Sequence, residues 1–263
     1  DIEVLAGSAY VAEALDAFAS VLDEGKIDQV EYDYFESLEY GGPFRKFLQA
    51  YGYYDLLLIT PLGDVVYSVR QEAELAKNVK DDFLPDTFLG KTLNNALTQV
   101  TLTDFQVYQP SAGKLIAFLS APVKTSVGGE TVGTVVLKLT HEKINEIMLE
   151  RTGMGKTGEA YLVGPEMLMR SDAYLDPEHR TVVAAFREPA QGRVETTSTM
   201  EALAGNSGQL IQPDFRGVRV LSAYIPVQWG EIIYALMAEI EEKEAFKAIF
   251  QLQRWIGFTA LAL

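Results

Sequence analysis

The chain of 263 residues contains no cysteine and only two histidines, His141 and His179. The lack of cysteine excludes disulfide bonds, thiolate catalysis and sulfur-ligated metals. Neither histidine has a second histidine or a carboxylate at a spacing typical of a metal site. The chain also lacks the Gly-x-Ser-x-Gly and His-Glu-x-x-His patterns of common hydrolases. We therefore expect no metal, no cofactor and no enzymatic activity in this region.

Basic residues are scarce, with 22 against 37 acidic ones and a formal net charge of −15. Contact with nucleic-acid phosphates needs a basic surface, so a nucleic-acid binder is excluded. Docking on an anionic membrane surface is disfavoured for the same reason. Eleven of the acids lie in residues 1–40, against the single base Lys26. Such a run is typical of a solvated face, and it could also serve as a dimer or partner surface.

Long apolar runs are absent except at the end of the chain, where residues 255–263 form an uncharged apolar run. A membrane-spanning helix needs ~20 such residues. The run could be a buried terminal helix or the first part of a transmembrane helix. Trp255 stands where interfacial aromatic residues stand, and Gln251, Gln253 and Arg254 precede it as a polar segment. These features favour the second interpretation, in which residues 246–263 begin a transmembrane helix.

The apolar spacing predicts a long first helix, within residues 1–30, followed by strands. Val4, Val11, Leu15, Phe18 and Leu22 recur at helical intervals. Residues 53–60 and 65–69 read as a β-hairpin around a Pro-x-Gly-Asp turn. A short helix over 88–97, strands over 101–108, 115–122 and 131–139, and a helix over 141–151 come next.

The same layout then begins again, with strands over 160–164, 167–171, 217–225 and 232–240. Because the strands are joined by hairpins, we predict an α+β fold with antiparallel sheets, in two similar lobes over residues 31–145 and 146–245. Residues 153–158 match G-x-G-x-x-G, but a helix precedes them and a strand follows. That order is the reverse of a dinucleotide site, so we interpret them as a glycine-rich linker.

A candidate binding site emerges in the first lobe, where aromatic side chains on strands accompany isolated polar ones. Its members are Tyr54, Tyr67, Asp104, Phe105, Tyr108, Phe118, Ser120 and Lys138. Lys138 stands inside an apolar run, where a lone cation is costly unless it faces water or a partner. It is either a solvent-facing lysine or a cation in a pocket wall that meets an anionic ligand. Asp55 and Asp104 are either strand-end caps or polar anchors of that pocket.

Several segments resemble one family. TGEAYLVG at residues 157–164, followed by LMRS at 168–171, is similar to the second half of double Cache sensor domains. GYYDL at 52–56 and VYSV at 66–69 are similar to the first half. Residues 104–111 and 216–224 extend the resemblance, which covers nearly the whole chain.

The resemblance implies a long N-terminal helix followed by two tandem PAS-like lobes with antiparallel sheets. Such domains lie in the periplasm or extracellular space between two transmembrane helices of bacterial chemoreceptors, histidine kinases, cyclases and phosphatases. They bind a small molecule in the membrane-distal lobe, here 31–145, and signal through the terminal helices. Any kinase, cyclase or phosphatase output would lie outside this chain.

One departure from the family bears on the ligand. Amino-acid-binding members carry an aspartate on the last strand of the distal lobe, and Lys138 occupies the matching position here. Their Tyr/Arg/Trp/Tyr pattern is also absent from residues 70–100. The reversed charge predicts an organic acid or another small anion in place of an α-amino acid. The alternative function is a ligandless interaction module that docks a periplasmic protein or forms a homodimer.

Overall fold

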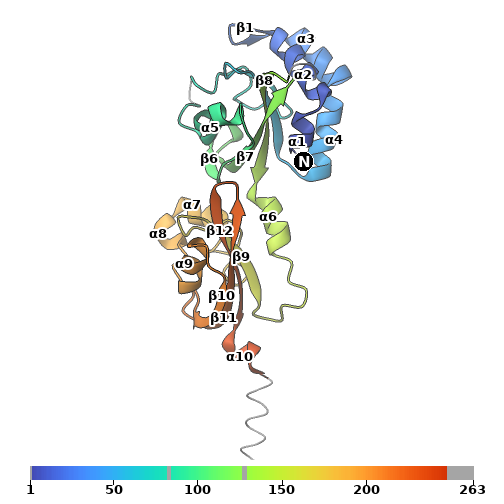
Figure 1. The fold of residues 1–263 in the computed structure, drawn as a ribbon. Coiled ribbons are helices and arrows are strands. Elements are labelled where there is room, and N and C mark those ends of the chain that lie inside the picture. The colour runs from blue at the N-terminus through green and yellow to red at the C-terminus, as the bar shows by residue number, and fades with distance from the viewer. Residues whose placement is uncertain (1, 82–83, 126–128, 248–263) are drawn as a thin grey trace, which may run out of the picture. The chain divides into compact units, whose positions relative to one another are not determined.

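The computed structural model describes residues 2–81, 84–125 and 129–247. The chain forms two compact units, Asp1–Lys143 and Ile144–Leu263 (Figure 1). Each unit holds an antiparallel sheet with helices, so the predicted α+β class is confirmed. The division falls two residues before the expected boundary at 145, and the predicted N-terminal helical segment belongs to the first unit.

The first helix is not continuous. It consists of α1 (Ile2–Ala6) and α2 (Ala9–Ser20), separated by Gly7 and Ser8. Ser8 is extended, with φ −78° and ψ 131°, as is usual at the start of a helix. Glycine also weakens a helix interior, so the helix is interrupted at Gly7 and Ser8. The break leaves Val4 81% exposed, whereas Val11, Leu15 and Phe18 on α2 are buried as the spacing predicts.

A helical segment that the sequence analysis did not identify follows. The short strands β1 (Leu22–Asp23) and β2 (Lys26–Ile27) form a hairpin, and α3 (Gln29–Tyr34) begins after it. The Asp28 side chain caps α3 by accepting from the backbone amides of Val30 and Glu31. The π-helix η1 (Phe35–Glu39) and α4 (Gly41–Tyr51) continue the segment. Gly52 ends α4 with φ 75°, which favours glycine.

The sheet of the first unit has the order β4-β3-β8-β7-β5, with β6 also paired to β7. Its strands are β3 (Asp55–Ile59), β4 (Val65–Ser68), β5 (Thr101–Leu102), β6 (Gln106–Tyr108), β7 (Lys114–Lys124) and β8 (Thr131–Thr140). The predicted hairpin of β3 and β4 is present. The single strand expected over 101–108 is instead two short strands. At the break the Thr103 hydroxyl, in place of a backbone carbonyl, accepts from the Phe118 amide.

The two faces of this sheet carry separate cores. On one face Phe18 of α2 stacks on Tyr67 with ring centroids 4.4 Å apart, and Tyr32 and Phe44 close the cluster. The other face packs Leu57, Tyr108 and Phe118 against α5 (Phe88–Ala96). The short helix η2 (Gln109–Ser111) follows β6. Because strand side chains alternate between faces, Asp55 and Lys138 lie on the α5 face.

The second unit has the sheet order β10-β11-β12-β9. The helix α6 (His141–Met148) crosses the division between the two units at residues 143 and 144. The further elements of the second unit are β9 (Glu159–Val163), α7 (Val182–Arg187), α8 (Pro189–Gly192), α9 (Thr197–Leu203), β10 (Gly208–Pro213), β11 (Arg219–Trp229), β12 (Ile232–Glu241) and α10 (Glu242–Ala245). The strand expected over 167–171 is reduced to isolated bridges. There the buried Arg170 side chain donates to the Leu168 carbonyl and fills the space over Gly164. The edge strand β10 was not predicted.

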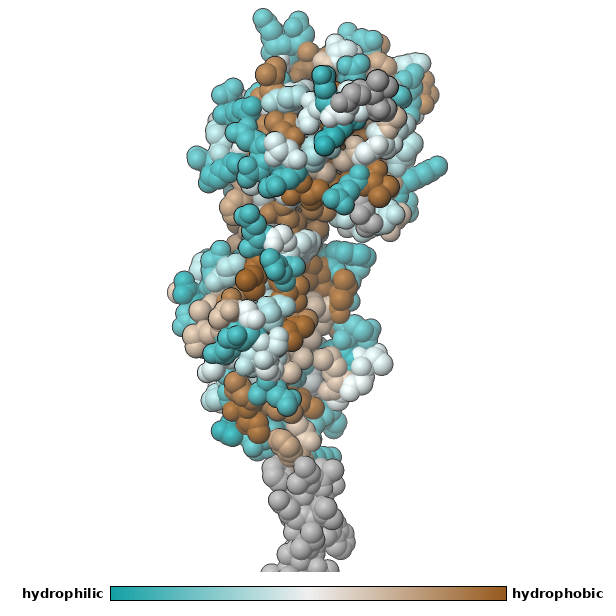
Figure 2. Space-filling model, in the orientation of Figure 1, coloured by the Kyte–Doolittle hydropathy of each residue, from teal (hydrophilic) through white to brown (hydrophobic). Residues whose placement is uncertain are grey.

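Figure 2 shows polar residues over much of the visible surface of each unit, with apolar residues in smaller groups. Within the described residues, no helix has both the length and the apolar character needed to cross a membrane. The transmembrane start expected over 246–263 lies outside the described residues from position 248 onward.

Phe18→Ala is expected to destabilise the protein by about 3–5 kcal/mol, because it removes a fully buried ring that contacts Tyr67 and Tyr32. The control Leu38→Ala, at a side chain that is 73% exposed, should change the free energy of unfolding by less than about 0.5 kcal/mol. Urea unfolding of both variants measures the difference. Equal effects would show that the core is not centred on Phe18.

Candidate functional site

The structure brings some of the predicted site residues together on the α5 face of the first sheet. Tyr108 and Phe118 are fully buried there, with ring centroids 5.0 Å apart in an edge-on arrangement. Lys138 is fully buried on the neighbouring strand, with its ammonium 5.2 Å from the centroid of the Tyr108 ring. Tyr54 packs against the same core and is partly exposed.

Lys138 is not a free cation, and this corrects the expectation drawn from its sequence position. Its ammonium lies 3.3 Å from Asp55 Oδ2 and 2.7 Å from Glu72 Oε2, and it also pairs with Glu74. It donates a further hydrogen bond to Ser111 Oγ at 3.2 Å. Three carboxylates thus already surround the single ammonium, so Lys138 has no uncompensated charge to offer an anionic ligand. We call Lys138, Asp55, Glu72 and Glu74 the buried ion cluster.

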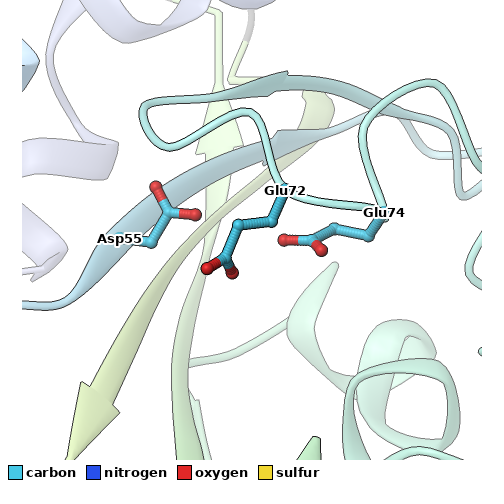
Figure 3. A group of neighbouring side chains, drawn as sticks. All are labelled: Asp55, Glu72 and Glu74. Carbon is cyan, nitrogen blue, oxygen red and sulfur yellow. The ribbon is translucent and has the colours of Figure 1, made fainter. Parts of the chain in front are cut away.

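The three carboxylates come from two elements and converge on one point (Figure 3). Asp55 begins β3 directly opposite Lys138 of β8 in the strand register. Glu72 and Glu74 lie on the loop that follows β4. Asp55 also accepts from the amides of Leu56 and Arg70 and from the Ser68 hydroxyl. Asp55 therefore fixes the start of this loop as well as pairing with Lys138.

Backbone geometry holds the loop in place. Gln71 and Ala76, on either side of the two glutamates, have positive φ values of 52° and 63°. The Gln71 amide donates to Ser68 Oγ at 2.8 Å, and the Ala76 amide donates to the Val65 carbonyl. Non-glycine residues seldom adopt this conformation, so the surrounding hydrogen bonds must stabilise it. Its result is that both glutamate side chains turn back toward Lys138.

Burial and charge act on these groups in opposite directions. Burial raises the pKa of Asp55 and Glu74, and the nearby Lys138 ammonium offsets this only in part. Burial also acts to raise the pKa of Glu72. Hydrogen bonds from Lys138, Ser111 and Tyr54 outweigh it, so that pKa is lowered. Burial acts to lower the pKa of Lys138, but Glu74 and Asp55 raise it overall, so the ammonium stays charged at neutral pH.

Tyr54 connects the cluster to the surface. Its hydroxyl donates to Glu72 Oε1 at 2.7 Å, and burial together with this bond raises the pKa of Tyr54 to about 12. The exposed Arg70 guanidinium stacks over the Tyr54 ring at 4.0 Å, and the ammonium of the exposed Lys114 lies 5.8 Å from the same ring. Neither cation forms an ion pair within the part of the chain that the structure describes. We call Tyr54, Arg70 and Lys114 the cationic rim.

The other predicted residues do not all belong to this site. Tyr67 lies on the opposite face of the sheet, in the core around Phe18, because the register shifts between Leu58 and Ile59. Asp104 accepts from the Phe105 amide at 2.7 Å, which is typical of a turn residue. Phe105 is buried near it, and Ser120 is buried on β7 opposite Thr101.

Sequence analysis missed Glu72, Glu74 and Ser111 as site residues. Glu72 and Glu74 lie on a loop and Ser111 ends the short helix η2, and the path of neither segment can be read from apolar spacing. One signal was present, because a lysine inside an apolar run needs a buried anion. Glu72 and Glu74 lie 66 and 64 residues before Lys138, so the sequence does not show which acids supply it. Asp55 was recognised as an acid at the start of an apolar strand, and the structure makes it the partner of Lys138.

The cluster also has the composition of a small cation site. Asp55, Glu72 and Glu74 each offer one carboxylate oxygen, and these three oxygens lie within 4.8 Å of one another. Oxygen ligands of this kind suit Ca²⁺ or Mg²⁺. The Lys138 ammonium, however, already contacts all three carboxylates. The charge of Lys138 takes the place that a metal ion would fill.

A separate groove of about 630 Å³ lies along α2, next to the end of β3 and the start of β8. Small side chains such as Ala12 and Ala19 line it together with Glu13 and Asp16. None of the eight predicted site residues lines this groove. Since α2 covers the Tyr67 face of the sheet, the groove is distinct from the buried ion cluster.

Comparison with known proteins identifies the fold. No protein-family model matches the chain, and no curated protein sequence is recognisably similar. Among solved structures, the sensor domain of the V. cholerae histidine kinase DctB aligns with a TM-score of 0.51 at 12% identity, covering 92% of this chain and 87% of that one. The ligand-binding domain of the Pseudomonas aeruginosa PAO1 amino acid chemoreceptor PctB, in complex with L-Gln, aligns with a TM-score of 0.50 at 14% identity, covering 95% and 96%. The chain therefore shares the fold of these two sensor domains, in agreement with the fold that the resemblance predicted.

Lys138→Met is expected to destabilise the protein by about 3–5 kcal/mol at neutral pH, because it leaves buried carboxylates without a cation. Asp55 and Glu74 already have raised pKa values, and the change raises them further. The folded state then binds protons that the unfolded state has released. The lost stability should therefore return as the pH falls toward the ordinary carboxyl range.

Urea unfolding at neutral pH and at about pH 5 measures this effect. Lys114→Met, which removes an exposed lysine of the same unit, is the matched control and should change stability by less than about 0.5 kcal/mol. A loss in Lys138→Met that is the same at both pH values would contradict the role assigned to the buried carboxylates.

Proposed function

We propose that this chain is the extracytoplasmic sensor domain of a bacterial transmembrane signalling receptor, a chemoreceptor or a sensor histidine kinase. The supporting observation is the two-unit fold, which matches sensor domains of both receptor kinds over about nine-tenths of the chain. The absence of cysteine and of known hydrolase patterns agrees with a binding role. In this proposal the first unit receives a small solute, and the second unit passes the change on through the terminal segment.

The proposed ligand is a small organic acid that binds at the cationic rim. Arg70 and Lys114 are exposed cations on one aromatic ring, and neither forms a close ion pair with a described residue. Arg70 Nε donates to the Tyr54 carbonyl at 2.6 Å, and Lys114 acts on Glu142 only at longer range. A guanidinium is planar and can bind a carboxylate through two hydrogen bonds. The proposed ligand is therefore still an anion, as Lys138 led us to predict. Its proposed site is now the cationic rim, which contains residues that the sequence analysis did not select. Only Tyr54 is common to both sets.

A chain of hydrogen bonds supports a route for the signal. Tyr54 donates to Glu72, and Glu72 accepts from Lys138, which pairs with Asp55 on the adjacent strand. A ligand that moves Arg70 or Tyr54 therefore shifts the balance of charges around Lys138. A shift of this kind produces a signal only when the solute binds two arrangements of the protein with different affinity.

A second function is favoured by one specific observation. Lys138, Glu72 and Ser111 satisfy one another without any bound solute. A first unit of this kind could act as a ligandless module that couples to another protein or to a second copy of the chain. The acidic first 40 residues would then supply the docking surface.

Calorimetry on the full chain with a panel of organic acids, amines and neutral solutes tests the proposal. We expect an organic acid to bind and Arg70→Gln to weaken it by about 10- to 100-fold, because charged hydrogen bonds are lost. Lys124→Gln, which removes an exposed lysine far along β7, is the matched control and should leave affinity unchanged.

Binding of amines in preference to acids would overturn the ligand class. Absence of binding across the panel, together with capture of a protein partner that depends on the acids of residues 23–39, would favour the ligandless module.

A further inference from the structure

Three polar side chains form a row across the buried face of the second sheet. In the strand register Ser222 of β11 lies opposite Glu239 of β12, and Glu239 lies opposite Glu159 of β9. Side chains in such positions have Cβ atoms about 5 Å apart. Ser222, Glu239 and Glu159 are 0%, 4% and 1% exposed. Two acidic side chains of like charge thus stand directly opposite each other in the protein interior.

Each glutamate has one satisfied oxygen and one unsatisfied oxygen. Glu159 Oε2 accepts from the Leu175 amide at 3.0 Å, and Glu239 Oε2 accepts from the Tyr161 hydroxyl at 2.9 Å. The second oxygen of each, Oε1, is buried and has no hydrogen-bond partner within the described residues. The Ser222 hydroxyl beside them makes no hydrogen bond of ordinary geometry, although it lies near enough to Glu239 to act against the rise in the pKa of that carboxyl. Buried polar atoms without partners are rare and costly.

The charged groups around the pair leave it without a cation. Arg216 reaches Asp214 at 2.7 Å and Glu241 at 3.6 Å, and it acts on Glu159 only at longer range. Arg219 is engaged by Glu242 of α10, and Glu244 of α10 accepts from the backbone amides of residues 156 and 157.

The helix α9, which packs on β11 and β12, adds the buried but uncharged Ser198 and Thr199. No ion pair of the described residues includes Glu159 or Glu239. An ionised carboxylate in such surroundings is costly unless it is neutralised.

We propose that Glu159 and Glu239 hold one proton between them, so that the second unit contains a proton-binding site that responds to external pH. The proton comes from solvent, and the charge of the pair changes from −2 to −1. The resulting O–H group on one glutamate donates to the unsatisfied oxygen of the other. A single proton thereby satisfies both Oε1 atoms.

The direction of the pH response follows from the burial of the pair. Burial raises the pKa of both Glu159 and Glu239 above the ordinary glutamate value. Between that ordinary value and the raised one, the folded protein holds a proton that the unfolded chain has released. Stability of the second unit therefore rises as the pH falls, and it is lost as the pH rises through the raised pKa. Within this pH range, a difference of one bound proton between the folded and unfolded states changes the folding equilibrium constant about tenfold per pH unit.

A proton suits this pair better than a metal ion does. Ca²⁺ takes 6–8 oxygen ligands at about 2.4 Å, and Mg²⁺ requires octahedral geometry. The row offers only two free carboxylate oxygens and one hydroxyl. Asp214 cannot add a ligand, because its oxygens accept from Arg216 and from the Val218 amide.

Hydrogen exchange of β9 and β12 peptides in the full chain, between about pH 5 and pH 8 and corrected for the intrinsic exchange rate, tests this inference. Glu239→Gln places an amide where the protonated acid would be, and its N–H can donate to Glu159. We expect this variant to keep the protection of the wild type at low pH and to lose most of the pH dependence. Glu159→Gln should behave in the same way.

Glu231→Gln, at an exposed position in the β11–β12 turn, is the matched control and should keep the pH dependence of the wild type. Infrared spectra give a second readout, since the protonated-carboxyl signal that grows as the pH falls should be smaller in the variant that carries both substitutions than in the wild type. Equal pH dependence in wild type and both single variants would overturn the proposal, and so would protection that requires Ca²⁺ and disappears with a chelator. Because the readout is in the second unit, failure here is distinct from failure of ligand binding in the first.

Discussion

The buried ion cluster is the interaction on which the first unit depends. A charged lysine on a central strand is tolerated only because Asp55, Glu72 and Glu74 supply anions at contact distance. The same contacts fix three parts of the chain at once, namely the start of β3, the loop after β4 and the strand β8. Removal of Lys138 would leave all three carboxylates without a cation, so the conformation of the loop depends on this one charge. The position of the cationic rim follows from it, because Arg70 lies at the beginning of that loop.

The sequence allowed the sheet to be predicted but not the loops that complete the site. Hairpin turns and strand alternation identified β3, β4, β7 and β8, and alternation is why Asp55 and Lys138 share a face. Tyr67 was assigned to the wrong face because the register shift between Leu58 and Ile59 places both Val66 and Tyr67 on the helix side. A bulge of this kind leaves no mark in the apolar pattern. Glu72 and Glu74 were missed because positive φ values at Gln71 and Ala76 turn the loop inward, and no glycine announces these turns.

The two units solve the problem of buried acids in different ways. In the first unit Lys138 is a built-in cation, and burial of the acids is offset mainly by charge pairing. In the second unit Glu159 and Glu239 face each other without a cation, and a proton is the smallest species that satisfies them. A repeated fold therefore carries two unlike electrostatic sites on corresponding sheets. The proposed solute site and the proposed proton site belong to different cores, so substitutions can test them separately.

The proposed signalling function requires a site whose interactions a solute can shift. The buried ion cluster meets this condition because the pKa of Glu72 is lowered while those of Asp55 and Glu74 are raised, although all three carboxylates share one ammonium. Glu72 is favoured as the charged partner by the hydrogen bonds of Tyr54 and Ser111. A solute that draws Tyr54 away removes one of these bonds and transfers part of the attraction of Lys138 to Asp55 and Glu74. Asp55 and Lys138 lie opposite each other on paired strands. In the proposed function, a change in the attraction between Lys138 and Asp55 therefore acts on the pairing of β3 with β8, and binding of a solute can in this way alter the sheet.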